Sequence, residues 1–172
     1  MRLWKKKELF LKMVSELHNT LCARAVKWLK GSQGCMVTAS EIKCWGSNEE
    51  PDAIGWTSMK SILVEVKVSK ADFYRDKNKY FRQEPEYGIG DLRYYLTPKG
   101  LLNHDNLPEG WGLLEIYGSK IRKIKESEPF KKNTYAEIGI LASALKRKEE
   151  EEPNTPSYLD LKSDYDHVCN LC

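Results

Sequence analysis

The segment Ser61-Ile-Leu-Val-Glu-Val-Lys-Val-Ser69 decides the fold of this chain, because it carries the clearest alternation in the sequence. Apolar side chains occupy every second position, which is the period of a β-strand. β-Branched residues also favour the pleated surface of a buried sheet. The segment therefore predicts a strand with one core face and one mixed face. The core face comprises Ile62, Val64, Val66 and Val68, and the other face comprises Leu63, Glu65 and Lys67.

The residues before this strand predict one long helix and two short strands. Apolar residues recur at steps of three or four over 5–30, as on an amphipathic helix, and Gly31 would end it. Strands are expected over 35–42 and 52–57, with a turn over 46–51 between them. The expected core face of the helix consists of Phe10, Met13, Leu17, Leu21, Ala25 and Trp28.

A second helix is expected directly after the strand. Ser69 can cap this helix in the pattern Ser69-x-x-Asp72. We expect the helix to run to about Gln83, since Pro85 and the glycines that follow it break helices.

The rest of the chain predicts three more strands and a closing helix. A strand is expected over 92–97, and strands over 113–117 and 120–124 are joined by a two-residue hairpin. The pattern Thr134-x-x-Glu137 is a capping box for the last helix. The expected core face of that helix consists of Ile138, Leu141, Ala142 and Leu145.

Helices at both ends and in the middle of a mixed sheet predict an α/β sandwich. The apolar pattern ends at Pro153, so we assign residues 1–148 to one domain and residues 149–172 to a flexible acidic tail. The tail holds seven acids and one base. The whole chain has a net charge of +3, and the first 148 residues have +9. A basic body with an acidic tail suits a polyanionic partner.

The composition is that of a globular protein, with 41% hydrophobic and 31% charged residues, which argues against a disordered chain. No apolar run approaches the roughly 18 residues of a membrane-spanning helix, and we expect no membrane association. The first residues do not resemble a secretory signal. Five cysteines, an odd number, favour reduced thiols, so we expect a cytoplasmic protein.

Asp52, Glu65 and Lys67 are the candidate catalytic residues. Glu65 and Lys67 project from one face of the strand, roughly 6–7 Å apart, and Asp52 on a neighbouring strand could meet Glu65. Two facing carboxylates repel each other unless a cation lies between them, and a hard divalent ion such as Mg²⁺ (or Mn²⁺) suits oxygen ligands. Such an ion activates a bound water, and Lys67 can stabilise the developing charge. The residues therefore predict metal-assisted hydrolysis of a phosphodiester. The alternative interpretation is a Glu/Lys pair on a solvent-facing strand.

The order of these residues resembles the PD-(D/E)XK nuclease superfamily, in which Pro-Asp (here Pro51-Asp52) precedes Glu-x-Lys (here Glu65-Val66-Lys67) on an apolar strand. The next residues, Val68-Ser69-Lys70-Ala71-Asp72-Phe73, then Asp76-Lys77 and Tyr80, resemble its MmcB-like branch, which is related to DNA repair. Segments 92–96, 107–114 and 117–119 match later parts of that branch. The resemblance covers roughly residues 35–125.

The resemblance implies a restriction-endonuclease-like α-β-α sandwich around a mixed central sheet. It implies that Asp52 and Glu65 ligate the metal with the backbone carbonyl of Val66, and that Lys67 assists the nucleophilic water. A further acid often precedes the aspartate in this superfamily. Glu41 is the best match for it, and Glu49 and Glu50 are the alternatives.

The resemblance also implies a metal-dependent nuclease that hydrolyses DNA, with single-stranded or branched DNA among the candidate substrates and a homodimer as one candidate assembly. The superfamily also contains members that bind nucleic acid without cutting it, so an inactive binding or adaptor module is the alternative. The helix after Glu-x-Lys carries residues that could contact a nucleic acid backbone, although a solvated helix face is the other interpretation. These residues are Lys70, Arg75, Lys77, Lys79, Tyr80 and Arg82.

Other metal-ligating residue types give weaker signals. The pattern His167-x-Cys169-x-x-Cys172 has one cysteine pair and too few ligands for a structural zinc site. His18 and His104 have no evident partner in the sequence, so we expect them to be surface or core residues.

Overall fold

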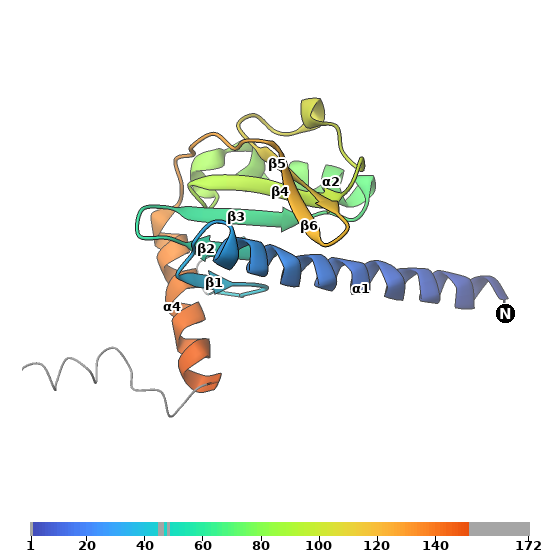
Figure 1. Ribbon diagram of the computed structural model, residues 1–172, viewed down its shortest axis with the longest axis horizontal. Helices are drawn as coiled ribbons and strands as arrows, with labels where there is room; N and C mark the ends of the chain where they lie inside the picture. The colour runs from blue at the N-terminus through green and yellow to red at the C-terminus, as the bar shows by residue number, and fades with distance from the viewer. Residues whose placement is uncertain (1, 45–46, 48, 152–172) are drawn as a thin grey trace, which may run out of the picture.

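The computed structural model describes residues 2–44, 47 and 49–151 of the chain. The described part contains four α-helices, six strands and two short 3-10 helices (Figure 1). The helices are α1 (Arg2–Gly31), α2 (Lys70–Lys77), α3 (Tyr80–Gln83), η1 (Pro85–Tyr87), η2 (His104–Asn106) and α4 (Thr134–Glu151). The strands are β1 (Val37–Ala39), β2 (Ala53–Trp56), β3 (Ser61–Val66), β4 (Leu92–Pro98), β5 (Gly112–Tyr117) and β6 (Lys120–Lys125).

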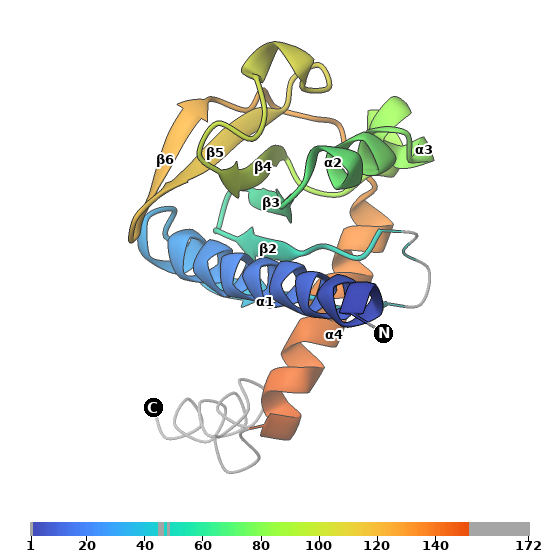
Figure 2. The same cartoon turned by 90° about the vertical axis from the view of Figure 1, so that its right-hand side faces the viewer.

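The six strands form one mixed sheet in the order β1-β2-β3-β4-β5-β6. The central pairs β3–β4 and β4–β5 are parallel, and the remaining pairs are antiparallel. Helices lie on both faces of the sheet (Figure 2). This architecture confirms the predicted α/β sandwich.

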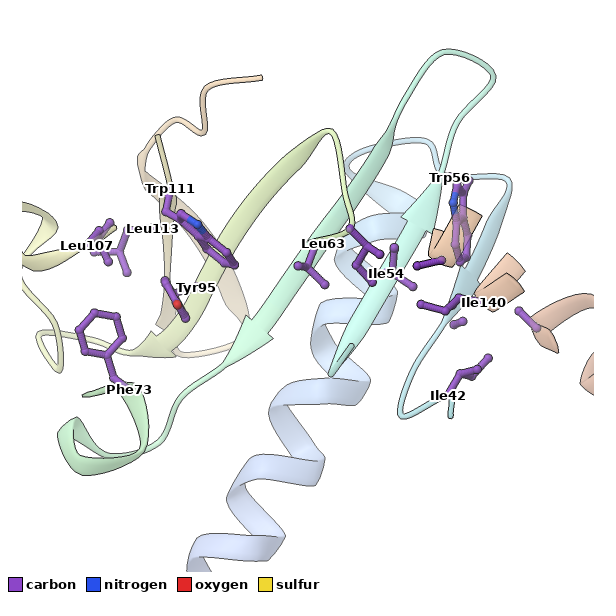
Figure 3. Packing of buried hydrophobic residues seen from close by; sticks show 14 of the residues in the cluster. Ile42, Ile54, Trp56, Leu63, Phe73, Tyr95, Leu107, Trp111, Leu113 and Ile140 are labelled. Carbon is purple, nitrogen blue, oxygen red and sulfur yellow. The ribbon is translucent and has the colours of Figure 1, made fainter. Parts of the chain in front are cut away.

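The alternation of β3 divides its side chains between two cores, so both faces of the strand are buried. Ile62 and Val64 pack in one cluster with Leu21 and Leu29 of α1. The opposite cluster contains Leu63 and side chains from α2, α4 and the neighbouring strands (Figure 3). The strand ends at Val66, three residues earlier than predicted.

Helix α1 approaches β2 closely where a glycine leaves room for it. A Cβ atom on Gly55 would lie 2.7 Å from the Sγ atom of Cys35 and 3.3 Å from the Cβ atom of Leu29. Gly55 therefore allows this close approach of α1 to the sheet.

The predicted core face of α1 is correct only in its second half. Leu21, Ala25 and Trp28 are buried, but Phe10 and Met13 are 64% and 59% exposed, and Leu17 is also exposed. The reason is the length of the helix, because its first turns extend past the end of the sheet (Figure 1). Helical periodicity predicts an apolar face but does not show how much of it a sheet can cover.

Two other helices differ from the predictions. Ser69 caps α2 as expected, because its side chain accepts a hydrogen bond from the Asp72 amide, but the expected single helix is divided at Asn78 and Lys79. The amide of Ala136 donates to the side chain of Asn133, so the residue that caps α4 is Asn133 rather than Thr134. The buried residues of α4 are Ala136, Glu137, Ile140 and Ala144, whereas Ile138, Ala142 and Leu145 of the predicted face are exposed.

The predicted acidic tail begins inside α4, which continues through Glu151. The rest of the tail, with His167, Cys169 and Cys172, lies outside the described residues. Within the described ranges, no helix combines the length and the apolar character needed to cross a membrane.

Candidate active site at the end of β3

Asp52 and Glu65 come together because of the register of β2 and β3. The two strands are antiparallel, and Ala53 pairs with Val64. The same register places Asp52, which directly precedes β2, opposite Glu65. The Asp52 side chain is fixed there, because its Oδ2 atom accepts a hydrogen bond from the Val66 amide at 2.7 Å.

Lys67 directly follows β3 and contacts both carboxylates. Its Nζ atom lies 2.9 Å from Glu65 Oε2 and 3.6 Å from Asp52 Oδ2. A third carboxylate oxygen, Oδ1 of Asp76 on α2, lies 3.7 Å from the same nitrogen. The structure therefore brings together all three predicted catalytic residues and adds Asp76 to them.

Burial argues against the surface-pair interpretation of Glu65 and Lys67. The two residues are only 2% and 5% exposed. They occupy the mixed face of β3, which α2 and α3 cover. A Glu/Lys pair buried to this degree is uncommon, because charges leave water at a high cost.

Arg82 is an interior residue that neutralises this group of acids. Its guanidinium lies 3.2 Å from Glu65 Oε1 and 2.9 Å from Asp76 Oδ2, and it also pairs with Glu49. The side chain of Arg82 has no exposed surface. The prediction that Arg82 contacts nucleic acid therefore conflicts with its position. Helix α3 turns this residue inward, where it balances buried carboxylates.

Asp76 joins α2 to the sheet. Its Oδ2 atom accepts a hydrogen bond from the Tyr95 hydroxyl of β4 at 2.8 Å, and its Oδ1 atom pairs with Lys79 at 2.8 Å. Tyr95 also stacks on Trp111, with the ring centroids 4.4 Å apart. These contacts hold the acid beside Lys67.

The environment changes the pKa of each candidate catalytic group. Burial raises the pKa of Glu65 from 4.5 to about 7, and the charges of Lys67 and Arg82 offset this effect only in part. Burial alone would lower the pKa of Lys67, but the carboxylates of Glu65, Asp76 and Asp52 raise it above its ordinary value. Burial opposes ionisation of Asp52 too, but the hydrogen bond with His18 and the charge of Lys67 lower its pKa.

His18 and Cys22 of α1 belong to this site, although the sequence reasoning gave neither of them a functional role. The His18 Nε2 atom lies 3.4 Å from Asp52 Oδ1, and its Nδ1 atom lies 3.6 Å from the Cys22 Sγ atom. Hydrogen bonds with Asp52 and Cys22 raise the pKa of His18 to about 10. One ligand atom from each of the three residues lies within 4.8 Å of the others, so this group could hold a metal ion. The i, i+4 spacing of His18 and Cys22 was the available signal, because it places both on one helix face.

The three candidates for a further acid occupy different positions. Glu41 is exposed and has a positive φ of 49°. Burial is the main cause that raises the pKa of Cys22, and the charge of Glu41 adds to this effect. Glu49 is buried, pairs with Arg82, and accepts a hydrogen bond from the Ile89 amide. Glu50 is exposed and lies 3.5 Å from Lys43. Glu49 is therefore bound to structural partners, whereas the charge of Glu41 acts on Cys22 of the His18–Cys22–Asp52 group.

Most of the predicted nucleic-acid residues lie on the outside of α2 and just after it. Lys70, Arg75, Lys79 and Tyr80 are exposed, and Lys77 is half-buried and donates to the main-chain oxygen of Asn106. A shallow hollow of about 260 Å³ separates this surface from α1, and its lining includes His18, Ser69, Asp72 and Arg75. His18, which contacts Asp52, therefore lies in the same hollow as Arg75 of the basic surface.

The comparisons with known proteins bear on the fold. No family model matches the sequence, and no curated protein matches it either. One solved structure that is similar to this chain is that of a protein of unknown function from Silicibacter pomeroyi. The two share 18% sequence identity, and the match has a TM-score of 0.58 and covers 75% of this chain and 84% of the other. The fold of this chain therefore resembles that of the Silicibacter pomeroyi protein.

Proposed function

We propose that this chain is a metal-dependent nuclease that hydrolyses DNA phosphodiester bonds in DNA repair or processing. One observation carries the proposal: the ammonium of Lys67 lies 2.9 Å from Glu65 and 3.6 Å from Asp52 at the carboxyl end of β3. In α/β folds, ligands bind at the carboxyl ends of the parallel strands. The resemblance to the PD-(D/E)XK superfamily predicts the same three residues.

The donor atoms of this site suit a hard divalent cation. Carboxylate oxygens are the ligands that Mg²⁺ prefers, and Asp52 and Glu65 supply them. Oε1 of Glu65 is buried and, apart from its ion pair with Arg82, has no hydrogen-bond partner among the described residues. A cation would satisfy this atom. Asp52, Glu65 and the main-chain carbonyl of Val66 would hold Mg²⁺ or Mn²⁺, which supplies a Lewis acid and lowers the pKa of a bound water.

The residues around this ion would divide the remaining tasks. Lys67 is kept protonated by the surrounding carboxylates, so its ammonium can orient the attacking water and stabilise the charge that develops on the phosphate. Arg82 fixes Glu65 through their ion pair, and the Val66 amide fixes Asp52. These contacts restrain the carboxylates before a substrate arrives, as electrostatic catalysis requires.

The exposed bases beside the site support DNA as the substrate. Lys70 and Arg75 face solvent on α2, and Arg75 borders the hollow next to His18. Lysine and arginine side chains that neutralise phosphates make binding strong at low salt and weak at high salt. The aromatic ring of Tyr80 is 59% exposed and is available for stacking on a base.

Cleavage assays with matched variants test the proposal. Single-stranded, double-stranded and branched DNA would be incubated with Mg²⁺ or Mn²⁺ and with Asp52→Asn or Lys67→Ala protein. We expect either change to reduce the cleavage rate roughly a hundredfold or more, because each removes a group that acts on the transition state. Glu50→Gln, a change to an exposed acid outside the site, is the control and should cleave like the wild type. Full cleavage by a folded Asp52→Asn or Lys67→Ala variant would contradict the assignment.

A non-cleaving DNA-binding module is the second candidate function. The observation that favours it is the near-complete burial of Glu65 and Lys67, whose charges are already balanced by protein partners. In the same assays this module would bind DNA in a salt-sensitive manner, would be indifferent to EDTA, and would cut no substrate.

A further inference from the structure

Two different kinds of metal ligand meet at Asp52. On one side lie Glu65 and Lys67, and on the other lie the imidazole of His18 and the thiol of Cys22. The two groups share Asp52, but His18 and Cys22 take no part in the proposed nuclease chemistry.

The positions of the three ligand atoms fit a small tetrahedral ion. The His18 Nε2 atom lies 3.4 Å from Asp52 Oδ1 and 3.9 Å from Cys22 Sγ. In a tetrahedral zinc site, with bonds of about 2.0 Å to nitrogen or oxygen and 2.3 Å to sulfur, ligand atoms are about 3.3–3.5 Å apart. The two distances from His18 are within a few tenths of an ångström of this spacing, and all three ligand atoms lie within 4.8 Å of one another.

The ligand atoms of His18, Cys22 and Asp52 favour zinc over magnesium. A thiolate, an imidazole and a carboxylate form a mixed set that zinc binds well, whereas Mg²⁺ prefers oxygen atoms alone. The thiol of Cys22 is buried, and the side chains of His18 and Asp52 are 26% and 19% exposed. Three protein ligands would leave one of the four tetrahedral positions open, and His18 borders a solvent-accessible hollow.

Helix α1 and the start of β2 hold the ligands in place. His18 and Cys22 lie one turn apart on the same face of α1, and the Val66 amide fixes Asp52 from the sheet side. Leu21 packs in the core beside Cys22, so the helix is rigidly held at this turn. The site is thus assembled before any ion binds.

We propose that His18, Cys22 and Asp52 form a binding site for Zn²⁺, with one open coordination position. The proposal does not depend on nuclease activity, because the site would bind zinc in a chain that cuts no DNA.

Cobalt substitution and zinc titration test this site directly. His167, Cys169 and Cys172 could bind metal elsewhere, so the full chain would carry Cys169→Ser and Cys172→Ser in every sample. We expect Co²⁺ to give the near-ultraviolet charge-transfer absorption of a cobalt–thiolate bond. The Cys22→Ser change should abolish this absorption, and His18→Ala should weaken Zn²⁺ binding at least tenfold in a competition titration with a chromogenic chelator.

The matched control is Cys35→Ser, because Cys35 is also a free, buried thiol in the same core cluster. This variant should keep both the cobalt absorption and the zinc affinity. Circular dichroism would establish that each variant is folded, and Cys22→Ala would replace Cys22→Ser if the serine variant is not. The proposal is overturned if the parent protein gives no cobalt–thiolate absorption, or if a folded Cys22 variant retains it.

Discussion

Arg82 is the residue on which the buried charges of the site depend. It pairs with Glu49, Glu65 and Asp76, and all four side chains are almost completely buried. Removing one partner from a buried ion pair is costly, because the remaining charges stay in the interior without compensation.

We therefore expect Arg82→Met to lower the free energy of unfolding by about 3–5 kcal/mol. Urea denaturation at pH 7 would measure the change. Arg75→Met removes the same charge from an exposed position, so it should change the free energy by less than about 0.5 kcal/mol. Equal free energies of unfolding for the two variants would show that the ion pairs of Arg82 make no net contribution to stability.

The sequence allowed Asp52, Glu65 and Lys67 to be named as candidates, because strand alternation places Glu65 and Lys67 on one face. Their meeting with Asp52 depended on Asp52 lying beside a neighbouring strand, which the register of β2 and β3 provides. The sequence did not predict that Arg82 turns inward. A basic residue on a short helix is usually solvated, and Arg82 is buried only because Glu49, Glu65 and Asp76 surround it in the folded protein. His18 and Cys22 show the same limit. Their spacing defines a helix face, but only the packing of α1 on β2 brings that face to Asp52.

Among the elements, α1 has two halves with different contributions to stability. Leu21 is 2% exposed and packs against the sheet, whereas Leu11 is 57% exposed on the protruding turns. We expect Leu21→Ala to cost about 2–5 kcal/mol, since it leaves a cavity in the core. The same change at Leu11 should cost less than about 0.5 kcal/mol. Urea unfolding of both variants measures the difference. A comparable loss of unfolding free energy for Leu11→Ala would mean that Leu11 is buried in solution, which contradicts its exposed position.

The elements were predicted well where periodicity and burial agree. The strand over β3 and the Ser69 cap are in place because local patterns alone determine them. Of the predicted face of α4 only Leu141 packs against the core, and the rest of the prediction was wrong because Glu137, a charged residue, is buried by tertiary partners. Its carboxylate accepts hydrogen bonds from the Trp56 indole, the Ser61 hydroxyl and the Gly90 amide, and it pairs with Lys132. The spacing of apolar residues along the helix cannot predict such contacts, because they come from segments distant in the sequence.

In the whole molecule, Asp91 joins segments that are distant in the sequence. Its Oδ2 atom accepts hydrogen bonds from the Ser61 amide at 2.7 Å and from Lys132, which precedes α4, at 2.6 Å. Burial opposes ionisation of Asp91, but the hydrogen bonds with Lys132 and Ser61 lower its pKa below the ordinary value. The stability that this carboxylate contributes is therefore present above its unfolded pKa of about 3.9 and is lost as the pH falls through the lower folded value.

We expect Asp91→Asn to reduce the free energy of unfolding by about 1 kcal/mol at pH 7, because hydrogen bonds to a charged group are lost. The difference from the wild type should shrink below about pH 4, because the carboxylate of the unfolded chain takes up a proton before that of the native protein does. Urea unfolding of both proteins between pH 3 and pH 7 measures it. A difference that stays constant across this range would contradict the assigned role of the charge.

The overhang of α1 has a consequence for the Asp52 carboxylate, which lies beside Lys67. His18 lies where the free turns of the helix pass into the packed turns, between exposed Leu17 and buried Leu21. Because the helix is continuous through His18, a partner that bound the exposed turns and tilted them would move the imidazole relative to Asp52. By thermodynamic reciprocity, anything that clamps the imidazole to Asp52 also steadies those turns. The exposed turns of α1 are thus the part of the surface through which a bound partner would affect the Asp52 carboxylate.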